Sequence, residues 1–261
     1  MHPVINVAVD AAHAAANIMR RQIQHVDAIP VEKKARHDYV TEVDKACEEE
    51  IVRHIRHYYP NHAFLCEETG VKGDSNSVWV IDPLDGTSNY IHGIPHFAVS
   101  IAYQLNGRTE HGVVYDVMRD EMFMASRGSG ARLNQKRIRT ASRASLEDAV
   151  VATAFPFRQR DKLQAYARVF QGVLSKTEDF RRAGTASLDL AWVAAGRLDA
   201  YYEIGLQPWD VAAGTLLVRE AGGVVLDFEG GDQVETAGSI VAAPYKLMAP
   251  LQQIIAKNWK R

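Results

Sequence analysis

The sequence predicts a mixed α+β protein built from two halves, residues 1–143 and 144–261. In the first half, the apolar runs 97–105, 112–117 and 122–125 are separated by turn residues, as in consecutive strands of an antiparallel sheet. In the second half, short apolar strands alternate with helical patterns, which is typical of an α/β arrangement. No linker, repeat or low-complexity run separates the halves. We therefore expect an N-terminal α+β half and a C-terminal α/β half that pack as one compact unit.

The order of the elements follows from hydrophobic periodicity and from the residues that end each pattern. An alanine-rich helix is expected over residues 4–24, and a second amphipathic helix follows Asp44. Gly222 and Gly223 end the last helix before the C-terminal region. The remaining predicted elements are strands at 63–66, 78–81, 149–152 and 200–202 and helices at 163–174, 187–195 and 211–221.

Length and composition fit a cytoplasmic enzyme. The chain has 261 residues, of which 47% are hydrophobic, enough for a sizeable core. Its 30 basic and 32 acidic residues give a net charge of −2, so no direct nucleic-acid binding is expected. Asp10 and Asn17 interrupt the N-terminal apolar residues, which argues against a signal peptide or a membrane span. Cys47 and Cys66 have no paired spacing and are expected to be free and buried, as in a reducing compartment.

The segment 78–93, VWVIDPLDGTSNYIHG, contains the strongest functional signal in the chain. A buried strand delivers Asp82 at its carboxyl end, and Asp85 stands where the N-cap of a short helix is expected. Gly86 has no Cβ, so an anion such as phosphate could approach the backbone amides at the helix start. Because Asp82 and Asp85 would repel a phosphate, the site requires divalent cations between them. The segment thus predicts metal-dependent phosphoryl chemistry.

Further acids stand at the ends of other predicted elements. Glu67 and Glu68 follow one predicted strand, and Asp210 opens a predicted helix. Mg²⁺ prefers oxygen ligands in a near-octahedral array, so this set of carboxylates favours Mg²⁺ over zinc. Taken singly, each of these acids could instead end a strand or cap a helix, and the same holds for Asp44 before the second helix.

Several motifs follow one another along the chain in a fixed order. They are Glu67-Glu68, DPLDGTSN from Asp82 to Asn89, GTASLD from Gly184 to Asp189, WDVAAG from Trp209 to Gly214 and EAGG from Glu220 to Gly223. In this order and spacing they resemble the inositol monophosphatase family, and in particular its bacterial extragenic-suppressor subgroup. The likeness runs from the N-terminus to about residue 245. It implies a layered α-β-α-β-α sandwich of the sugar-phosphatase type, with the active site between the halves.

The resemblance also implies an activity and a set of site residues. The activity is that of a lithium-sensitive, Mg²⁺-dependent phosphomonoesterase that hydrolyses inositol 1-phosphate by direct attack of a metal-activated water. The metal-binding residues implied are Glu67 and the carbonyl of Leu84 for a first ion, Asp82 between the first and second, Asp85 and Asp210 for the second, and Glu68 through water for a third. The catalytic residues implied are Thr87, which orients the water, its carboxylate partner Asp44, and Glu67. Gly86 and Thr87 would bind phosphate, and Asp85, Ala186 and Glu203 would contact the substrate.

The resemblance leaves the substrate open within its superfamily. Fructose-1,6-bisphosphatase, phosphoadenosine phosphate phosphatase and histidinol phosphate phosphatase look like members of the same superfamily. Metal-binding acids cannot separate these activities, whereas contacts to the leaving group near Phe155 and Glu203 would. The family further implies a homodimer, with contacts around residues 97–105 and 180–182.

A function of another class is an alternative. Relatives in this subgroup are implicated in ribosomal RNA transcription through the antitermination machinery, so the chain could act mainly as a binding partner. A local basic cluster fits this alternative, although such a charge run is more often a solvated hairpin. The cluster consists of Arg132, Lys136, Arg137, Arg139 and Arg143.

Overall fold

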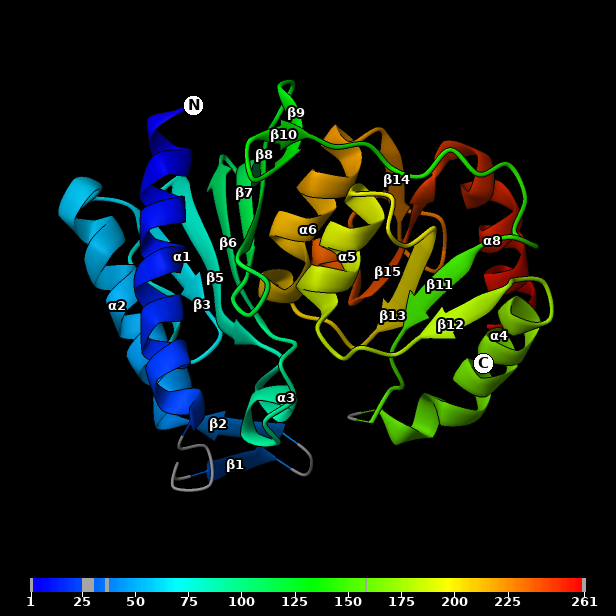
Figure 1. The fold of residues 1–261 in the computed structure, drawn as a ribbon, viewed down its shortest axis with the longest axis horizontal. Coiled ribbons are helices and arrows are strands. Elements are labelled where there is room, and N and C mark those ends of the chain that lie inside the picture. The colour runs from blue at the N-terminus through cyan, green and yellow to red at the C-terminus, as the bar shows by residue number, and fades with distance from the viewer. Residues whose placement is uncertain (1, 25–30, 36–37, 158, 260–261) are drawn as a thin grey trace.

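The computed structural model describes residues 2–24, 31–35, 38–157 and 159–259 and is built from alternating layers of helices and sheets (Figure 1). An eight-stranded and a five-stranded sheet lie between three pairs of helices. From left to right in Figure 1, the pairs are α1 (Pro3–Gln22) with α2 (Glu42–Tyr58), α5 (Ala186–Ala194) with α6 (Pro208–Glu220), and α4 (Leu163–Leu174) with α8 (Tyr245–Asn258). The predicted α-β-α-β-α sandwich is therefore confirmed.

The eight-stranded sheet contains the predicted antiparallel strands of the N-terminal half. Its order is β10-β9-β8-β7-β6-β5-β3-β4, and only β3 and β5 pair in parallel. Both edges of β6 are paired and its residues 98–102 are buried, whereas Leu105 is exposed, so the dimer contact expected around residues 97–105 stays a prediction. The strands are β3 (Ala63–Cys66), β4 (Gly70–Lys72), β5 (Ser77–Asp85), β6 (Ala98–Leu105), β7 (Arg108–Asp116), β8 (Glu121–Ser126), β9 (Gly130–Leu133) and β10 (Lys136–Arg137).

Strand β5 is longer than predicted because it continues through Pro83. Asp82 pairs with Ser100 and Asp85 with Ala98 of β6, so β5 contains one extra residue in a bulge. A bulge tolerates proline, which has no amide hydrogen to contribute to the ladder. Interpreting Pro83 as a strand breaker therefore ended the predicted strand too early. The bulge is the feature that turns the Asp82–Asp85 segment toward the site described below.

Helix α1 packs against α2 through its alanines. Pro3 occupies the first helical turn, and His2 accepts a hydrogen bond at 3.3 Å from an amide of that turn. The small side chains let the helices approach closely, and the Sγ of Cys47 lies 3.5 Å from the carbonyl oxygen of Ala15. Cys47 and Cys66 are both free and buried, as predicted. Before α2, β1 (Val31–Ala35) and β2 (Asp38–Thr41) form a small antiparallel sheet.

The five-stranded sheet belongs to the C-terminal half and has the order β12-β11-β13-β15-β14. Strand β11 pairs in parallel with both of its neighbours, whereas β15 pairs antiparallel with β13 and β14. Strand β12, which contains Phe180, is an edge strand, so the dimer contact expected there stays a prediction. The elements not yet given are β11 (Val150–Thr153), η2 (Arg160–Lys162), β12 (Asp179–Arg181), β13 (Ala200–Ile204), β14 (Gly223–Leu226), α7 (Val234–Ala237) and β15 (Ser239–Pro244).

The buried apolar side chains form three groups that hold the layers together. One lies between the α1–α2 pair and the eight-stranded sheet, the second between the two sheets around α5 and α6, and the third between the five-stranded sheet and α4 and α8. The middle layer is tight, since a Cβ on Gly112 of β7 would lie 3.0 Å from the Cα of Ala213 in α6. In the described part of the chain, no helix has the length and apolar character needed to cross a membrane.

Candidate functional site

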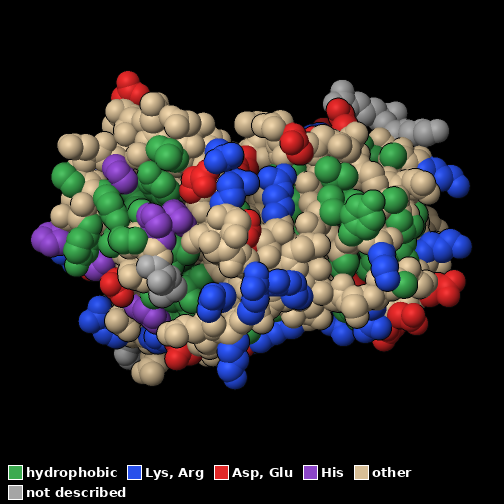
Figure 2. Space-filling view, turned by 90° about the horizontal axis from the view of Figure 1, so that it is seen from above, with side chains coloured by type: hydrophobic (Ala, Val, Ile, Leu, Met, Phe, Trp, Pro, Cys, Tyr) green, Lys and Arg blue, Asp and Glu red, His purple; other side chains and the backbone are tan. Residues whose placement is uncertain are grey.

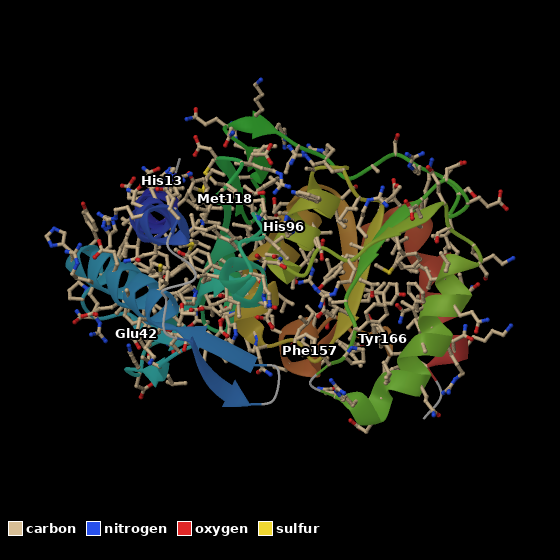
Figure 3. The ribbon with its side chains drawn as sticks, turned by 60° about the horizontal axis from the view of Figure 1, so that its bottom comes forward. His13, Glu42, His96, Met118, Phe157 and Tyr166 are labelled. Atoms are coloured by element: carbon tan, nitrogen blue, oxygen red, sulfur yellow. The ribbon has the colours of Figure 1, made fainter. Side chains whose placement is uncertain are left out.

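A cavity of about 110 Å³ at the carboxyl end of β5 is lined by residues of both halves. A larger cavity of about 480 Å³, between His2 and Arg132, has no carboxylate among its described lining residues and is a less suitable metal site. Phe157, which lies near the middle of the molecule in Figure 3, lines the smaller cavity in place of the expected Phe155. The lining of the smaller cavity consists of Glu67, Asp82, Leu84, Asp85, Gly86, Thr87 and Ser88 from the N-terminal half and Ala154, Phe157, Arg182, Gly184, Ala186, Glu203, Leu206 and Asp210 from the C-terminal half.

Burial and mutual repulsion raise the pKa values of the acids in this cavity. Asp82 is only 2% exposed, and its pKa is raised well above the usual value by burial and then by the charges of Glu67, Asp85 and Asp210. Asp210 is partly exposed to the cavity. Its pKa is also raised well above the usual value, first by burial and then by the charge of Asp85. A cluster of acids that is costly to ionise is stabilised by a cation that enters it.

The helix that follows these acids does not begin as predicted. Helix α3 (Thr87–Ile91) has Gly86 as its N-cap, so the expected N-cap role of Asp85 is wrong. The Oδ2 of Asp85 instead accepts a hydrogen bond at 2.7 Å from the amide of Ser187, in the first turn of α5. Thr185, the N-cap residue of α5, makes no capping bond with its own side chain. Asp85 thus caps a helix of the other half and ties the halves together at the site.

The structure gives a second reason for a glycine at position 86, in addition to the expected approach of an anion. The φ of Gly86, +98°, lies in the left-handed region, which favours glycine. A Cβ there would lie 2.7 Å from the Oγ1 of Thr185 and 3.1 Å from the carbonyl oxygen of His96, so it would point into the seam between the halves. Figure 3 shows His96 at this central position. The missing Cβ therefore lets the halves meet.

Replacing Gly86 by Ala is expected to lower the free energy of unfolding by at least about 2 kcal/mol, from backbone strain and overpacking together. Gly93 gives a matched control, because its φ is also positive, at +66°, but nothing lies within 4 Å of a Cβ there. Urea unfolding of both alanine variants separates the two causes. Equal losses for Gly86→Ala and Gly93→Ala would show that the contacts across the seam do not matter.

Thr87 and Asp44, which are far apart in the sequence, meet behind the cavity. The Oγ1 of Thr87 lies 2.9 Å from the Oδ1 of Asp44 and 3.1 Å from the carbonyl oxygen of Leu84. The other oxygen of Asp44 accepts bonds from the amide and the hydroxyl of Thr41, at 2.8 and 2.5 Å, which completes a capping box at the start of α2. Both interpretations of Asp44, as a helix cap and as the partner of Thr87, therefore hold. Burial raises the pKa of Asp44 above the usual value, although the hydrogen bonds from Thr41 and Thr87 oppose this.

Glu67 and Glu68 begin the turn after β3. Glu67 lines the cavity, and its amide donates to the carbonyl oxygen of Ile81 at 3.1 Å. Glu68 lies on the turn outside the cavity lining, and its amide donates at 2.8 Å to the Oε2 of Glu48 on α2. Sequence reasoning missed Glu48. The signal that could have found it is its position one helical turn after Asp44.

On the C-terminal side, Glu203 of β13 has a fixed orientation. Its Oε2 accepts a hydrogen bond at 2.5 Å from the hydroxyl of Tyr201, which is fully buried. Burial, then the charges of Glu203 and Asp189, raise the pKa of Tyr201 well above its usual value, so the hydroxyl remains a donor. Ala186 is the first residue of α5 and lines the cavity. Arg182 also lines the cavity, although the sequence suggested it only as a dimer contact. No spacing in the sequence marks Tyr201 or Arg182 as part of the site.

The basic cluster is exposed and lies away from the cavity. Lys and Arg side chains gather in the middle of the face shown in Figure 2, and β9 and β10 lie on that side of the molecule. In Figure 1, β9 and β10 lie at the top of the molecule, whereas α3, which begins beside the cavity, lies near the bottom. Arg143 pairs with Asp199 at 2.9 Å and so helps to hold the C-terminal half. The other exposed members are Arg132, Lys136, Arg137 and Arg139.

The donor set of the cavity fits hard divalent cations. It offers carboxylates and the carbonyl of Leu84, which are the oxygen ligands that Mg²⁺ binds. Burial and then the charge of Glu67 raise the pKa of Asp82, so a cation would relieve the repulsion between these acids. Among the described residues, no group of three or more acidic, histidine or cysteine side chains is placed so that it could hold a metal ion. The carboxylates would therefore have to move closer together to bind one.

Comparisons with known proteins point in the same direction as the geometry. The inositol monophosphatase family model matches residues 1–260. A Pseudomonas aeruginosa protein named Nus factor SuhB is 50% identical over 271 residues, with all of both chains covered. The crystal structure of extragenic suppressor protein SuhB from Bartonella henselae superposes with a TM-score of 0.95 at 41% identity, covering 98% of this chain and 99% of that one. The structure of inositol monophosphatase from Anabaena superposes with a TM-score of 0.87 at 34% identity, covering 97% of this chain and 95% of that one.

Proposed function

The chain belongs to the inositol monophosphatase family, and we propose that it is a Mg²⁺-dependent phosphomonoesterase that releases phosphate from inositol 1-phosphate. The observation that carries this proposal is the convergence of Asp82 and Asp85 with Asp210 of the other half in one cavity, next to the hydrogen-bonded Thr87–Asp44 pair. Such a cavity can hold cations against a phosphate ester and orient a water toward it.

The metal-binding roles are those that the family resemblance implies, and the residues that line the cavity support them. When bound, the ions would neutralise charge on the phosphoryl oxygens and lower the pKa of water. Glu68 would act on a third, weaker ion through water, since it lies outside the cavity lining. The direct ligands would be Glu67, Asp82 and the carbonyl of Leu84 for one ion and Asp82, Asp85 and Asp210 for the other.

The protein's own groups would place the attacking water and take up its proton. The hydroxyl of Thr87 donates to Asp44, so its oxygen can accept a hydrogen bond from a water in the cavity. As that water attacks phosphorus and the P–O bond to the inositol oxygen breaks, the proton of the water passes to the oxygen of Thr87 and the Thr87 proton passes to Asp44, while the leaving inositol oxygen takes a proton from a second water. Gly86 and Thr87, at the start of α3, would contact the phosphate. No covalent intermediate with the protein is needed.

The polar groups on the C-terminal side would recognise the alcohol part of the substrate. Glu203, held by the hydroxyl of Tyr201, would accept hydrogen bonds from neighbouring hydroxyls of a polyol. Asp85 would share one of these hydroxyls, and Ala186 would contact the ring. Arg182 adds a positive charge to this side of the cavity, which suits an anionic ester.

Phosphate release from a panel of esters tests the proposal. The panel contains inositol 1-phosphate, fructose 1,6-bisphosphate, phosphoadenosine phosphate and histidinol phosphate, each with Mg²⁺, with a chelator and with added lithium. We expect the highest kcat/KM for inositol 1-phosphate, with activity lost in the chelator and reduced by lithium. Preference for another ester would contradict the proposed substrate but would leave the proposed mechanism unchanged. Turnover that persists in the chelator would contradict the mechanism.

A second candidate is a role as a protein partner in transcription. The Pseudomonas aeruginosa relative is named a Nus factor. The exposed residues Arg132, Lys136, Arg137 and Arg139 offer a basic surface away from the cavity. Because the two roles would use different surfaces, they can coexist in one chain. If no ester of the panel is hydrolysed, this candidate becomes the leading one.

A further inference from the structure

Glu48 is a buried acid on α2 whose side chain serves the turn that begins with Glu67 and Glu68. It is 1% exposed. Its Oε2 accepts a hydrogen bond from the amide of Glu68 at 2.8 Å, and its Oε1 accepts one from the hydroxyl of Thr69. The ammonium of Lys72 on β4 lies 3.7 Å from Oε1 and partly balances the charge. One carboxylate thus binds consecutive residues of the turn.

The position of Glu48 on α2 links this turn to the Thr87–Asp44 pair. Residues four apart in a helix lie on the same face, and both Asp44 and Glu48 are 1% exposed. Asp44 contacts Thr87, and Glu48 contacts the turn after β3. A single rigid helix therefore fixes the distance between the proposed proton acceptor and the proposed metal-binding turn.

The chemistry of the contacts explains why a carboxylate is needed at position 48. Its two oxygens accept simultaneously from an amide and a hydroxyl, whereas an apolar side chain of similar size would leave both of these donors without their acceptor. A group that served only to fill space could be apolar, and burying a charge would then be an avoidable cost. The paired acceptors instead hold the backbone at Glu68, and through it the direction of Glu67.

We infer that Glu48 is a positioning residue, which fixes the turn so that Glu67 and Glu68 can bind Mg²⁺ with high affinity. The inference rests on the proposed function, since it assumes that these two acids bind the metal. Changes to hydrogen-bond partners of metal ligands typically weaken metal affinity by about 10- to 100-fold. The effect of losing Glu48 is therefore expected in the affinity for Mg²⁺ and not in the chemical step.

Calorimetric titration of the full chain with Mg²⁺ tests the inference without any substrate. Glu48→Leu removes both acceptors and is expected to weaken Mg²⁺ binding by at least about tenfold, while kcat at saturating Mg²⁺ stays within about threefold of wild type. Glu49→Leu is the matched control, because Glu49 is the next residue of the same helix and is exposed. Unchanged Mg²⁺ affinity in a folded Glu48→Leu variant would overturn the inference.

Thr69 gives a second pair of variants in case Glu48→Leu does not fold. Thr69 is exposed, so Thr69→Ala should fold, and it removes only the hydroxyl that binds Glu48. We expect weaker Mg²⁺ binding for Thr69→Ala and restored binding for Thr69→Ser, which keeps the hydroxyl. Equal affinities for Ala and Ser would contradict the inference. If wild type itself neither binds Mg²⁺ nor hydrolyses any ester, the proposed function fails, and the inference fails with it.

Discussion

Asp82→Asn is expected to reduce Mg²⁺-dependent phosphate release by at least about a thousandfold, because it removes a negative charge that the first and the second metal ion would share. Asn keeps the size of the side chain, so the cavity keeps its shape. Asp74→Asn, at an exposed position in the loop before β5, is the control for losing an aspartate charge near the same strand. The measurement is kcat/KM for inositol 1-phosphate at several Mg²⁺ concentrations. Activity within tenfold of wild type would contradict the metal assignment.

The same substitution is expected to leave the metal-free protein as stable as wild type or more stable at neutral pH. The pKa of Asp82 is raised in the folded protein by burial and then by neighbouring acids, so the folded state favours the protonated form. The protonated form of Asp82 therefore stabilises the folded protein at low pH, and this contribution is lost as the pH rises through the raised pKa. Asn cannot ionise, so it removes the cost. The melting temperature at pH 7.5 without Mg²⁺ measures this, and a drop of many degrees would mean that lost activity reflects lost folding.

Thr87→Val is expected to lower kcat by about 100- to 1,000-fold while leaving the affinity for Mg²⁺ nearly unchanged. Valine has almost the same shape as threonine, but it cannot orient a water or donate to Asp44 at 2.9 Å. Thr87→Ser keeps the hydroxyl and should recover most of the rate. Single-turnover rates and Mg²⁺ titrations of both variants make the measurement. A Val variant as active as the Ser variant would exclude the hydroxyl from the mechanism.

The pH dependence of kcat tests the Asp44 part of the same pair. Asp44 must be deprotonated to take up the proton, so kcat should fall as the pH falls toward its pKa, which burial raises above the usual value for aspartate. Asp44→Asn should remove this acid limb along with most of the rate. It should also cost about 1 kcal/mol of stability, because a neutral amide oxygen is a weaker acceptor than a carboxylate oxygen for the two bonds from Thr41. Thr87→Val leaves that cap intact, so comparing the two variants separates capping from catalysis.

The comparison of predicted and observed sites shows where local reasoning is reliable. The strands that lead to Glu67 and Asp82 were predictable because buried apolar runs are local signals, although β5 continues beyond Asp82 to Asp85. The N-cap role of Asp85 was wrong, since the amide that it binds belongs to Ser187 in the other half. The predicted contact of Gly86 with an anion stays a prediction, whereas the contact of its missing Cβ with Thr185 and His96 was not foreseen. The errors arose where the partner of a residue is distant in the sequence.

The sequence by itself determined the mixed α and β fold class, the order of most elements, the family resemblance and the acids that line the cavity. These depend on periodicity, on turn chemistry and on the order of short motifs, all of which are local in the chain. Only the tertiary structure decided that Asp44 meets Thr87, that Asp85 caps α5 and that Glu48 holds the turn at Glu68. The physical reason is that a hydrogen bond depends on distances of about 3 Å, which packing of the layers sets and sequence spacing does not.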